Sequence, residues 1–160
     1  MLSKIKDSFE EIKNSEEFKS WEEKHLSSYL TSIFFIDEFQ FDFYNPETDN
    51  ITSFKKENNE IKVIEEKIFR KEKSELKELK LNEIKISFDQ AINLIEKLIG
   101  EKYKGEEKQK VIVILQVLKA PTWNITYLTK RFNILNVKIN AISGEILEEK
   151  IQSAVSFKKS

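Results

Sequence analysis

The sequence predicts an α+β fold made of two tandem units, each a helix followed by a four-stranded antiparallel sheet, packed into one compact body. Three observations lead to this prediction. Apolar residues recur every three or four positions in two segments, which is the spacing of one helix face. After each segment the apolar period changes to two, as in strands that bury one face. The order of segments is the same in both halves of the 160 residues.

The chain opens with two helical patterns. A second helix is expected to start at Asn14, with Glu17 as its capping-box partner, so the chain should bend near residues 14 and 15. The apolar face of the first helix would comprise Leu2, Ile5, Phe9 and Ile12. That of the second would comprise Phe18, Trp21, His25 and Leu26.

Four strand-like runs complete the first half. The second run alternates strictly, so that its three phenylalanines share one face. The segment "NPETDN" that follows it has the composition of a turn. The four runs cover residues 28–36, 39–44, 51–54 and 60–69.

The second half repeats this order. A charged connector over residues 70–84, with a short helix around 74–79, leads to a helix capped by Ser87 with Gln90 as its capping-box partner. Gly100 or Gly105 is expected to end that helix. Its apolar face would comprise Phe88, Ala91, Ile92, Ile95, Leu98 and Ile99. Four strands are expected over residues 110–118, 122–129, 134–140 and 145–151.

The two halves also match in detail, which favours a tandem duplication. Phe39-x-Phe41-x-Phe43 corresponds to Trp123-x-Ile125-x-Tyr127, and "EIKVIEEK" resembles "EILEEK". The alternative is that the same element order arose without common descent. The predicted domains are residues 1–72 and 85–160, joined by a connector over 73–84. Because a unit of this size has a marginal core, the halves are expected to cover one another.

The segment "NVKINAISGEIL" predicts a short hairpin, because Gly144 can adopt the positive φ that reverses the chain. Together with "ISFDQA" and "WNITY", this segment resembles the PepSY family, in which a helix precedes a W-x-I/V strand and a glycine hairpin. Asn140 stands where that family usually has Asp. The first half resembles it only through the internal repeat, with Phe39 in the place of the Trp. The resemblance implies a PepSY/cystatin-like fold and a regulatory or inhibitory role toward a peptidase.

Composition narrows the function classes. The formal net charge of −1 supplies no general attraction for nucleic acid or an anionic membrane, so neither is expected as a partner. The absence of cysteine excludes thiolate chemistry and disulfides. The N-terminal segment has no apolar core of a signal peptide, and no run is long and apolar enough for a membrane span. We therefore expect a cytoplasmic protein.

Catalytic and cofactor sites find little support in the sequence. His25 is the only histidine, so neither a Ser-His-Asp set nor a usual zinc site is expected, and a packed structural role is favoured for it. Glu47 and Asp49 lack the spacing of a calcium loop, and the three glycines form no phosphate-binding motif. We expect no enzyme, no cofactor and no metal. A carboxylate-dependent hydrolase is the least favoured alternative, since no two acids stand out.

Aromatic residues on the alternating strands are the candidate binding residues. The simpler hypothesis is that they form the core, with Tyr44 exposed because it is out of phase with the phenylalanines. The functional hypothesis is an open sheet face that binds a protein or peptide, or a homodimer partner if that face is uncovered. A small-ligand protein with an apolar pocket between helix and sheet is the alternative function. The candidates are Phe39, Phe41, Phe43, Tyr44, Trp123 and Tyr127.

Overall fold

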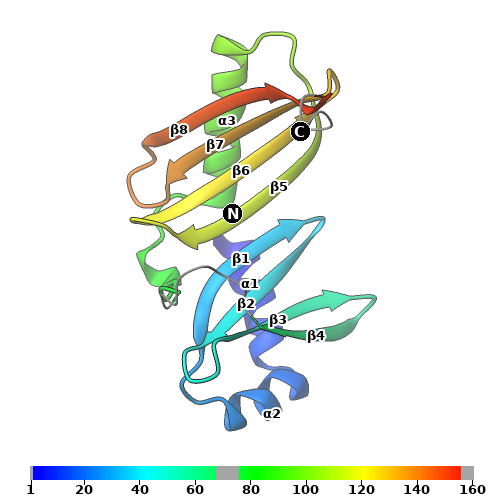
Figure 1. Ribbon diagram of the computed structural model, residues 1–160, viewed down its shortest axis with the longest axis vertical. Helices are drawn as coiled ribbons and strands as arrows, with labels where there is room; N and C mark the ends of the chain where they lie inside the picture. The colour runs from blue at the N-terminus through cyan, green and yellow to red at the C-terminus, as the bar shows by residue number, and fades with distance from the viewer. Residues whose placement is uncertain (1, 68–75, 156–160) are drawn as a thin grey trace. The chain divides into compact units, whose positions relative to one another are not determined.

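The computed structural model describes residues 2–67 and 76–155 (Figure 1). The described chain contains three α-helices and eight strands, and the strand pairs within each unit are all antiparallel. It divides into a first unit, Leu2–Leu81, and a second unit, Asn82–Ser160. The predicted α+β class is confirmed.

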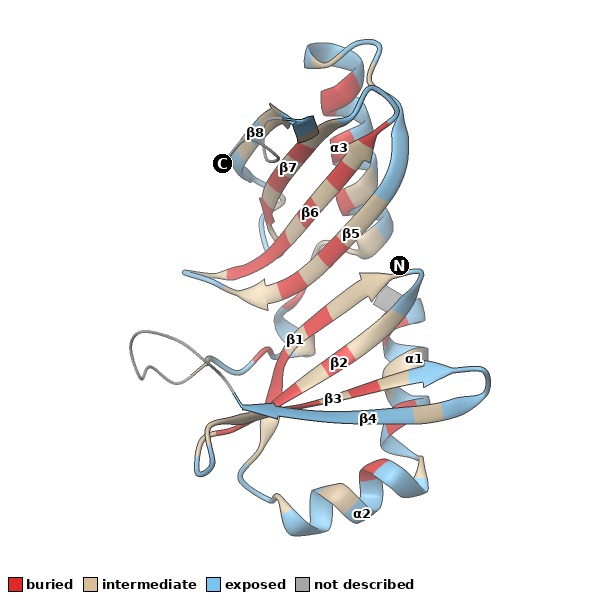
Figure 2. Cartoon of the chain, turned by 45° about the vertical axis from the view of Figure 1, so that its right-hand side comes forward, coloured by how far each residue is buried: buried red, intermediate tan, exposed pale blue. Residues whose placement is uncertain are grey.

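The first unit places two helices on one face of a four-stranded meander. Adjacent strands pair in the order β4-β3-β2-β1, and a bulge interrupts the β1–β2 ladder between Leu30 and Ser32. Strand β4 is exposed along most of its length (Figure 2). The elements are α1 (Leu2–Lys13), α2 (Glu16–Lys24), β1 (Tyr29–Ile36), β2 (Glu38–Asn45), β3 (Asn50–Glu57) and β4 (Glu60–Lys67).

Aromatic side chains dominate the core of the first unit. Helix α1 contributes Phe9, whose ring lies 5.2 Å from that of Phe41, and helix α2 contributes Phe18, whose ring lies 5.1 Å from that of Phe54. Tilted and edge-to-face rings of this kind add stabilisation beyond the area they bury. The aromatic cluster consists of Phe9, Phe18, Trp21, Phe41, Phe43 and Phe54.

The predicted bend between the first two helices is confirmed, but the boundaries of the second helix differ. Ser15, not Asn14, is the N-cap, because its hydroxyl oxygen accepts a hydrogen bond from the Phe18 backbone amide. The helix ends at Lys24, so Leu26 lies beyond it and is 84% exposed rather than part of an apolar face. The side chain of Leu2 lies outside the described part of the chain.

The second unit packs one long helix on one face of a second meander. Its strands pair in the order β5-β6-β7-β8. Aliphatic side chains supply most of the core, with Ile95 of the helix, Val113, Ile125 and Val137 almost fully buried. The elements are α3 (Phe88–Lys102), β5 (Lys108–Val117), β6 (Pro121–Thr129), β7 (Asn133–Asn140) and β8 (Ile146–Ser153).

Some of the local predictions for the second half are confirmed, and others are wrong. Both hydrogen bonds of the Ser87–Gln90 capping box are present, and Gly144 has φ +82° in the β7–β8 hairpin, as expected. Neither Gly100 nor Gly105 ends the helix, which continues to Lys102 and has Tyr103 as its C-cap. A non-helical stretch over residues 76–80 and a short 3-10 helix, Leu81–Glu83, replace the helix expected at 74–79. Residues 74–75, and residues 68–69 of the fourth predicted strand, lie outside the described residues.

Candidate functional site

Five of the six candidate aromatic residues lie on the helix-covered face of their own sheet. Phe41, Phe43, Trp123 and Tyr127 are buried, and Phe39 is half-buried. Figure 2 shows the corresponding alternation of buried and less buried positions along β2 and β6. The alternating aromatics therefore form core, as the simpler hypothesis proposed, and the aromatic faces are not open.

Tyr44 lies on the opposite face, yet it is not exposed as expected. Its side chain is only 1% accessible, its ring contacts that of Tyr29 at 5.8 Å, and its hydroxyl donates a hydrogen bond of 2.6 Å to Asp49 Oδ1. Asp49 has φ +56°, and its amide donates to the Asn45 carbonyl oxygen, which folds the turn back toward β2. The expectation was wrong: the phenol hydroxyl is paired with a carboxylate of the following turn, and its ring packs against Tyr29.

Trp123 and Tyr127 hold α3 and the residue Ile86 before it to the sheet of the second unit. The Trp123 indole Nε1 donates a hydrogen bond of 2.9 Å to the carbonyl oxygen of Ile86, just before α3. The Tyr127 hydroxyl donates to Glu96 Oε1 of α3 at 2.9 Å. Burial, followed by the hydrogen bond and the charge of Glu96, raises the pKa of Tyr127 well above its ordinary value. These polar contacts serve the fold and leave neither aromatic group available to a ligand.

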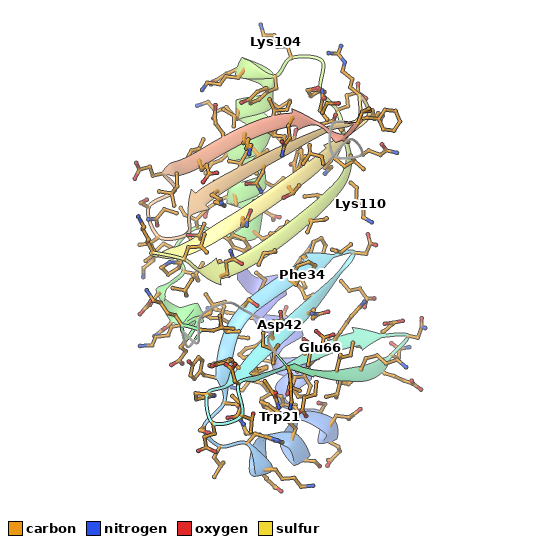
Figure 3. All side chains as sticks on the ribbon, in the orientation of Figure 1. Trp21, Phe34, Asp42, Glu66, Lys104 and Lys110 are labelled. Carbon is orange, nitrogen blue, oxygen red and sulfur yellow. The ribbon has the colours of Figure 1, made fainter. Side chains whose placement is uncertain are left out.

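The helix-free face of the first sheet carries a polar cluster at its centre. The Asp42 carboxylate accepts hydrogen bonds from Ser53 Oγ at 2.6 Å, Gln40 Nε2 at 2.9 Å and Ser32 Oγ at 3.0 Å. Phe34 lies opposite Gln40 in the β1–β2 register and flanks the cluster. Figure 3 labels Asp42 at this position, with Phe34 on β1 and Glu66 on β4.

The helix-free face of the second sheet has a corresponding cluster. Asn136 Nδ2 donates hydrogen bonds to Asn124 Oδ1 at 2.8 Å and to Thr126 Oγ1 at 2.9 Å. Thr126 pairs with Asn136 across β6 and β7, as Asp42 pairs with Ser53 across β2 and β3. Sequence analysis missed both clusters, although the polar residues that alternate with the aromatics were the available signal.

A groove of about 520 Å³ opens in the first unit beside α1 and the β1–β2 turn. It brings together Phe39 and Phe41, two of the candidate residues, whereas the other four candidates do not line it. Its apolar lining is Ile12, Phe35, Phe39 and Phe41, and its polar lining is Ser8, Glu11, Asp37, Glu38, Lys56, Asn58 and Asn59. The polar residues come from three separate segments, so no spacing in the sequence marks the site.

His25 has a structural environment. It caps the C-terminus of α2, its ring stacks on Trp21 with centroids 5.1 Å apart, and its Nδ1 lies 2.7 Å from the Trp21 carbonyl oxygen.

In the described part of the chain no three His, Cys, Asp or Glu side chains gather to hold a metal ion. None of the described helices combines the length and hydropathy that a membrane crossing requires.

Comparison with known proteins identifies similarity of fold. No protein-family model matches the chain, and no curated protein matches it. Among solved structures, a putative lipoprotein from Clostridium difficile 630 is similar, with a TM-score of 0.54 and 14% sequence identity over 85% of this chain and 90% of that one. At this identity the similarity supports the α+β fold and carries no information about activity.

Proposed function

We propose that the protein is a non-enzymatic interaction module that binds a protein or peptide through the helix-free faces of its two sheets. The observation that carries this proposal is the shared position of the two polar clusters. Each cluster includes a cross-strand pair on the two central strands of its sheet. The pair is Asp42 with Ser53 in the first unit and Thr126 with Asn136 in the second. The helices of each unit pack on the other face, where five of the six candidate aromatics lie (Figure 1).

These faces combine groups that suit protein recognition. Hydroxyl, amide and carboxylate groups lie at the centre and already hold one another in fixed positions, which lowers the entropy lost on binding. Apolar side chains flank them: Ile64 lies opposite Ser53, and Ile112 lies opposite Thr126. A half-exposed surface of this mixed character is typical of non-obligate protein interfaces.

Tandem PepSY-like units form part of this proposal. Three features of the second unit support it: the capping box at Ser87, the buried Trp123 on the strand after the helix and β5, and the Gly144 hairpin. Asn140 accepts hydrogen bonds from the amides of Ile142 and Ser143, a role that an Asp at this position would also fill. On this basis we propose a peptidase as the partner, regulated or inhibited by the module.

A matched pair of variants tests the proposed face. Asn136→Arg adds a long cation to the helix-free face, whereas Asn93→Arg makes the same change at an exposed position on α3. Each protein would be used as bait in lysate of its native cells, and the retained proteins would be identified by mass spectrometry and assayed for peptidase activity. We expect a protein that the wild type and Asn93→Arg retain and Asn136→Arg loses. Equal retention by all three baits would refute binding through this face.

The groove in the first unit favours a second function, that of a small-ligand binding protein. Its volume of about 520 Å³ falls in the range of small-molecule sites, and residues of helix α1 and of the strands line it, which supports this alternative. The measurement that tests this function is a native mass spectrum of protein purified without a refolding step. A bound small molecule would support it, and the mass of the bare chain alone would count against it.

A further inference from the structure

We propose that the groove of the first unit binds a small organic cation, an ammonium attached to an apolar body. This inference rests on the second function proposed above and is independent of the helix-free faces. Three observations carry it: an aromatic wall, an excess of carboxylates, and amide side chains that also line the groove.

Three neighbouring phenylalanine rings form the aromatic wall of the groove. The rings of Phe35 and Phe39 lie 4.8 Å apart, and those of Phe39 and Phe41 lie 6.4 Å apart. Ile12 of α1 lines the groove beside them. Such a wall accepts the apolar body of a ligand, and ring faces also attract a cation held within about 6 Å.

The charges at the rim favour a cation over an anion. Glu11 and Lys56 form an ion pair of 2.8 Å and so cancel one another. Asp37 and Glu38 also line the groove, and neither forms an ion pair with any residue that the structure describes. The rim therefore has two carboxylates in excess, next to an aromatic wall.

Both carboxylates belong to the β1–β2 turn region that lines the groove. Asp37 forms the turn between β1 and β2 with φ +66°, and Glu38 is the first residue of β2. Asn58 and Asn59, both with positive φ, form the β3–β4 turn at the same groove. Their side-chain amides supply hydrogen-bonding groups beside the carboxylates, and their NMR signals report directly on an occupant.

Three probes that share a phenyl group on a two-carbon chain separate the effect of charge from that of apolar contact. Phenethylammonium, its neutral analogue 2-phenylethanol and the anion 3-phenylpropanoate would be titrated into the full-length, isotope-labelled protein. The test variant is Asp37→Asn/Glu38→Gln, which keeps side-chain shape and the positive φ that Asn tolerates. The matched control is Glu23→Gln/Glu47→Gln, which removes two exposed carboxylates that do not line the groove.

The inference predicts that phenethylammonium shifts the side-chain signals of Asn58 and Asn59 and binds more tightly than either analogue. The test variant should weaken its binding about three- to tenfold, the range that two exposed ion pairs supply, and the control should not. Phe39→Leu, which keeps apolar volume without a ring, should weaken the cation more than the alcohol. Equal affinity for the three probes, or equal effects of the test and control variants, would overturn the inference. If the Asp37→Asn/Glu38→Gln variant does not fold, the relative affinities of the Phe39→Leu variant for the cation and the alcohol decide the test.

Discussion

Replacement of Tyr127 by Phe isolates one hydrogen bond between α3 and its sheet. The substitution keeps the ring, which is 1% exposed, and removes only the hydroxyl that donates to Glu96 Oε1. A hydrogen bond to a charged group contributes about 1.5–3 kcal/mol, and the lower end applies because Glu96 is exposed and regains water. We therefore expect Tyr127→Phe to lower the free energy of unfolding of the second unit by about 1.5 kcal/mol.

The same substitution should change how stability depends on pH. The folded pKa of Tyr127 is raised, so above the ordinary tyrosine value of about 10 the unfolded chain loses this proton while the folded chain keeps it. The unfolded state then binds fewer protons, and the stability that Tyr127 contributes falls by about 1.4 kcal/mol per pH unit. This contribution is fully present below pH of about 10 and is lost at higher pH. Tyr127→Phe should remove this contribution to the decrease of the free energy of unfolding with pH.

Urea unfolding followed by tryptophan fluorescence measures both effects. A Trp21→Phe background leaves Trp123 as the only indole, so the signal reports on the second unit. Glu96→Gln, which keeps an acceptor oxygen without the charge, completes a double-mutant cycle in which we expect a coupling of about 1 kcal/mol. Equal losses of stability above pH of about 10 in the wild type and Tyr127→Phe would show that the fold does not hold this proton.

Three further substitutions test the local signals of the second unit by chemical denaturation. Gly144→Ala should destabilise by about 1–2 kcal/mol, because φ is +82° and the added Cβ would lie 3.2 Å from Ile86 Cδ1; an unchanged midpoint would contradict this. Ser87→Ala removes the hydroxyl that caps α3 and should cost about 1 kcal/mol, whereas Ser87→Asp should cost much less. Asn140→Ala should destabilise the hairpin by about 1 kcal/mol and Asn140→Asp should not, since only the latter keeps an acceptor for two backbone amides; equal effects would refute that role.

The order and class of the elements could be predicted because the hydrophobic period records them locally. Each strand of the structure overlaps a predicted run, and β2 begins one residue before and ends one residue after its run. One error occurred where a single polar contact decides a helix boundary. The Ser15 hydroxyl, rather than the Asn14 side chain, reaches the Phe18 amide, and the first turn of α2 follows from that bond.

The candidate site was less predictable because alternation distinguishes two faces of a strand without showing which one a helix covers. Phe41 and Trp123 therefore fitted either a core or an open surface until the helices were placed. Tyr44 has the phase of an exposed residue, but a hydrogen bond to Asp49 across the following turn buries it. The groove requires side chains from α1, the β1–β2 turn and the β3–β4 turn, which only tertiary structure brings together.

The contrast between the aromatic core of the first unit and the aliphatic core of the second makes the two units spectroscopically distinct. Packed, asymmetric rings produce near-ultraviolet circular dichroism, and its loss is the mark of lost tertiary packing. The phenylalanine bands of that signal should come mainly from the packed rings of the first unit, whereas the methyl groups of Ile95, Val113, Ile125 and Val137 give the second unit its own NMR reporters. The order in which the two units lose structure on heating can therefore be followed in the intact chain, without cutting it or attaching a dye.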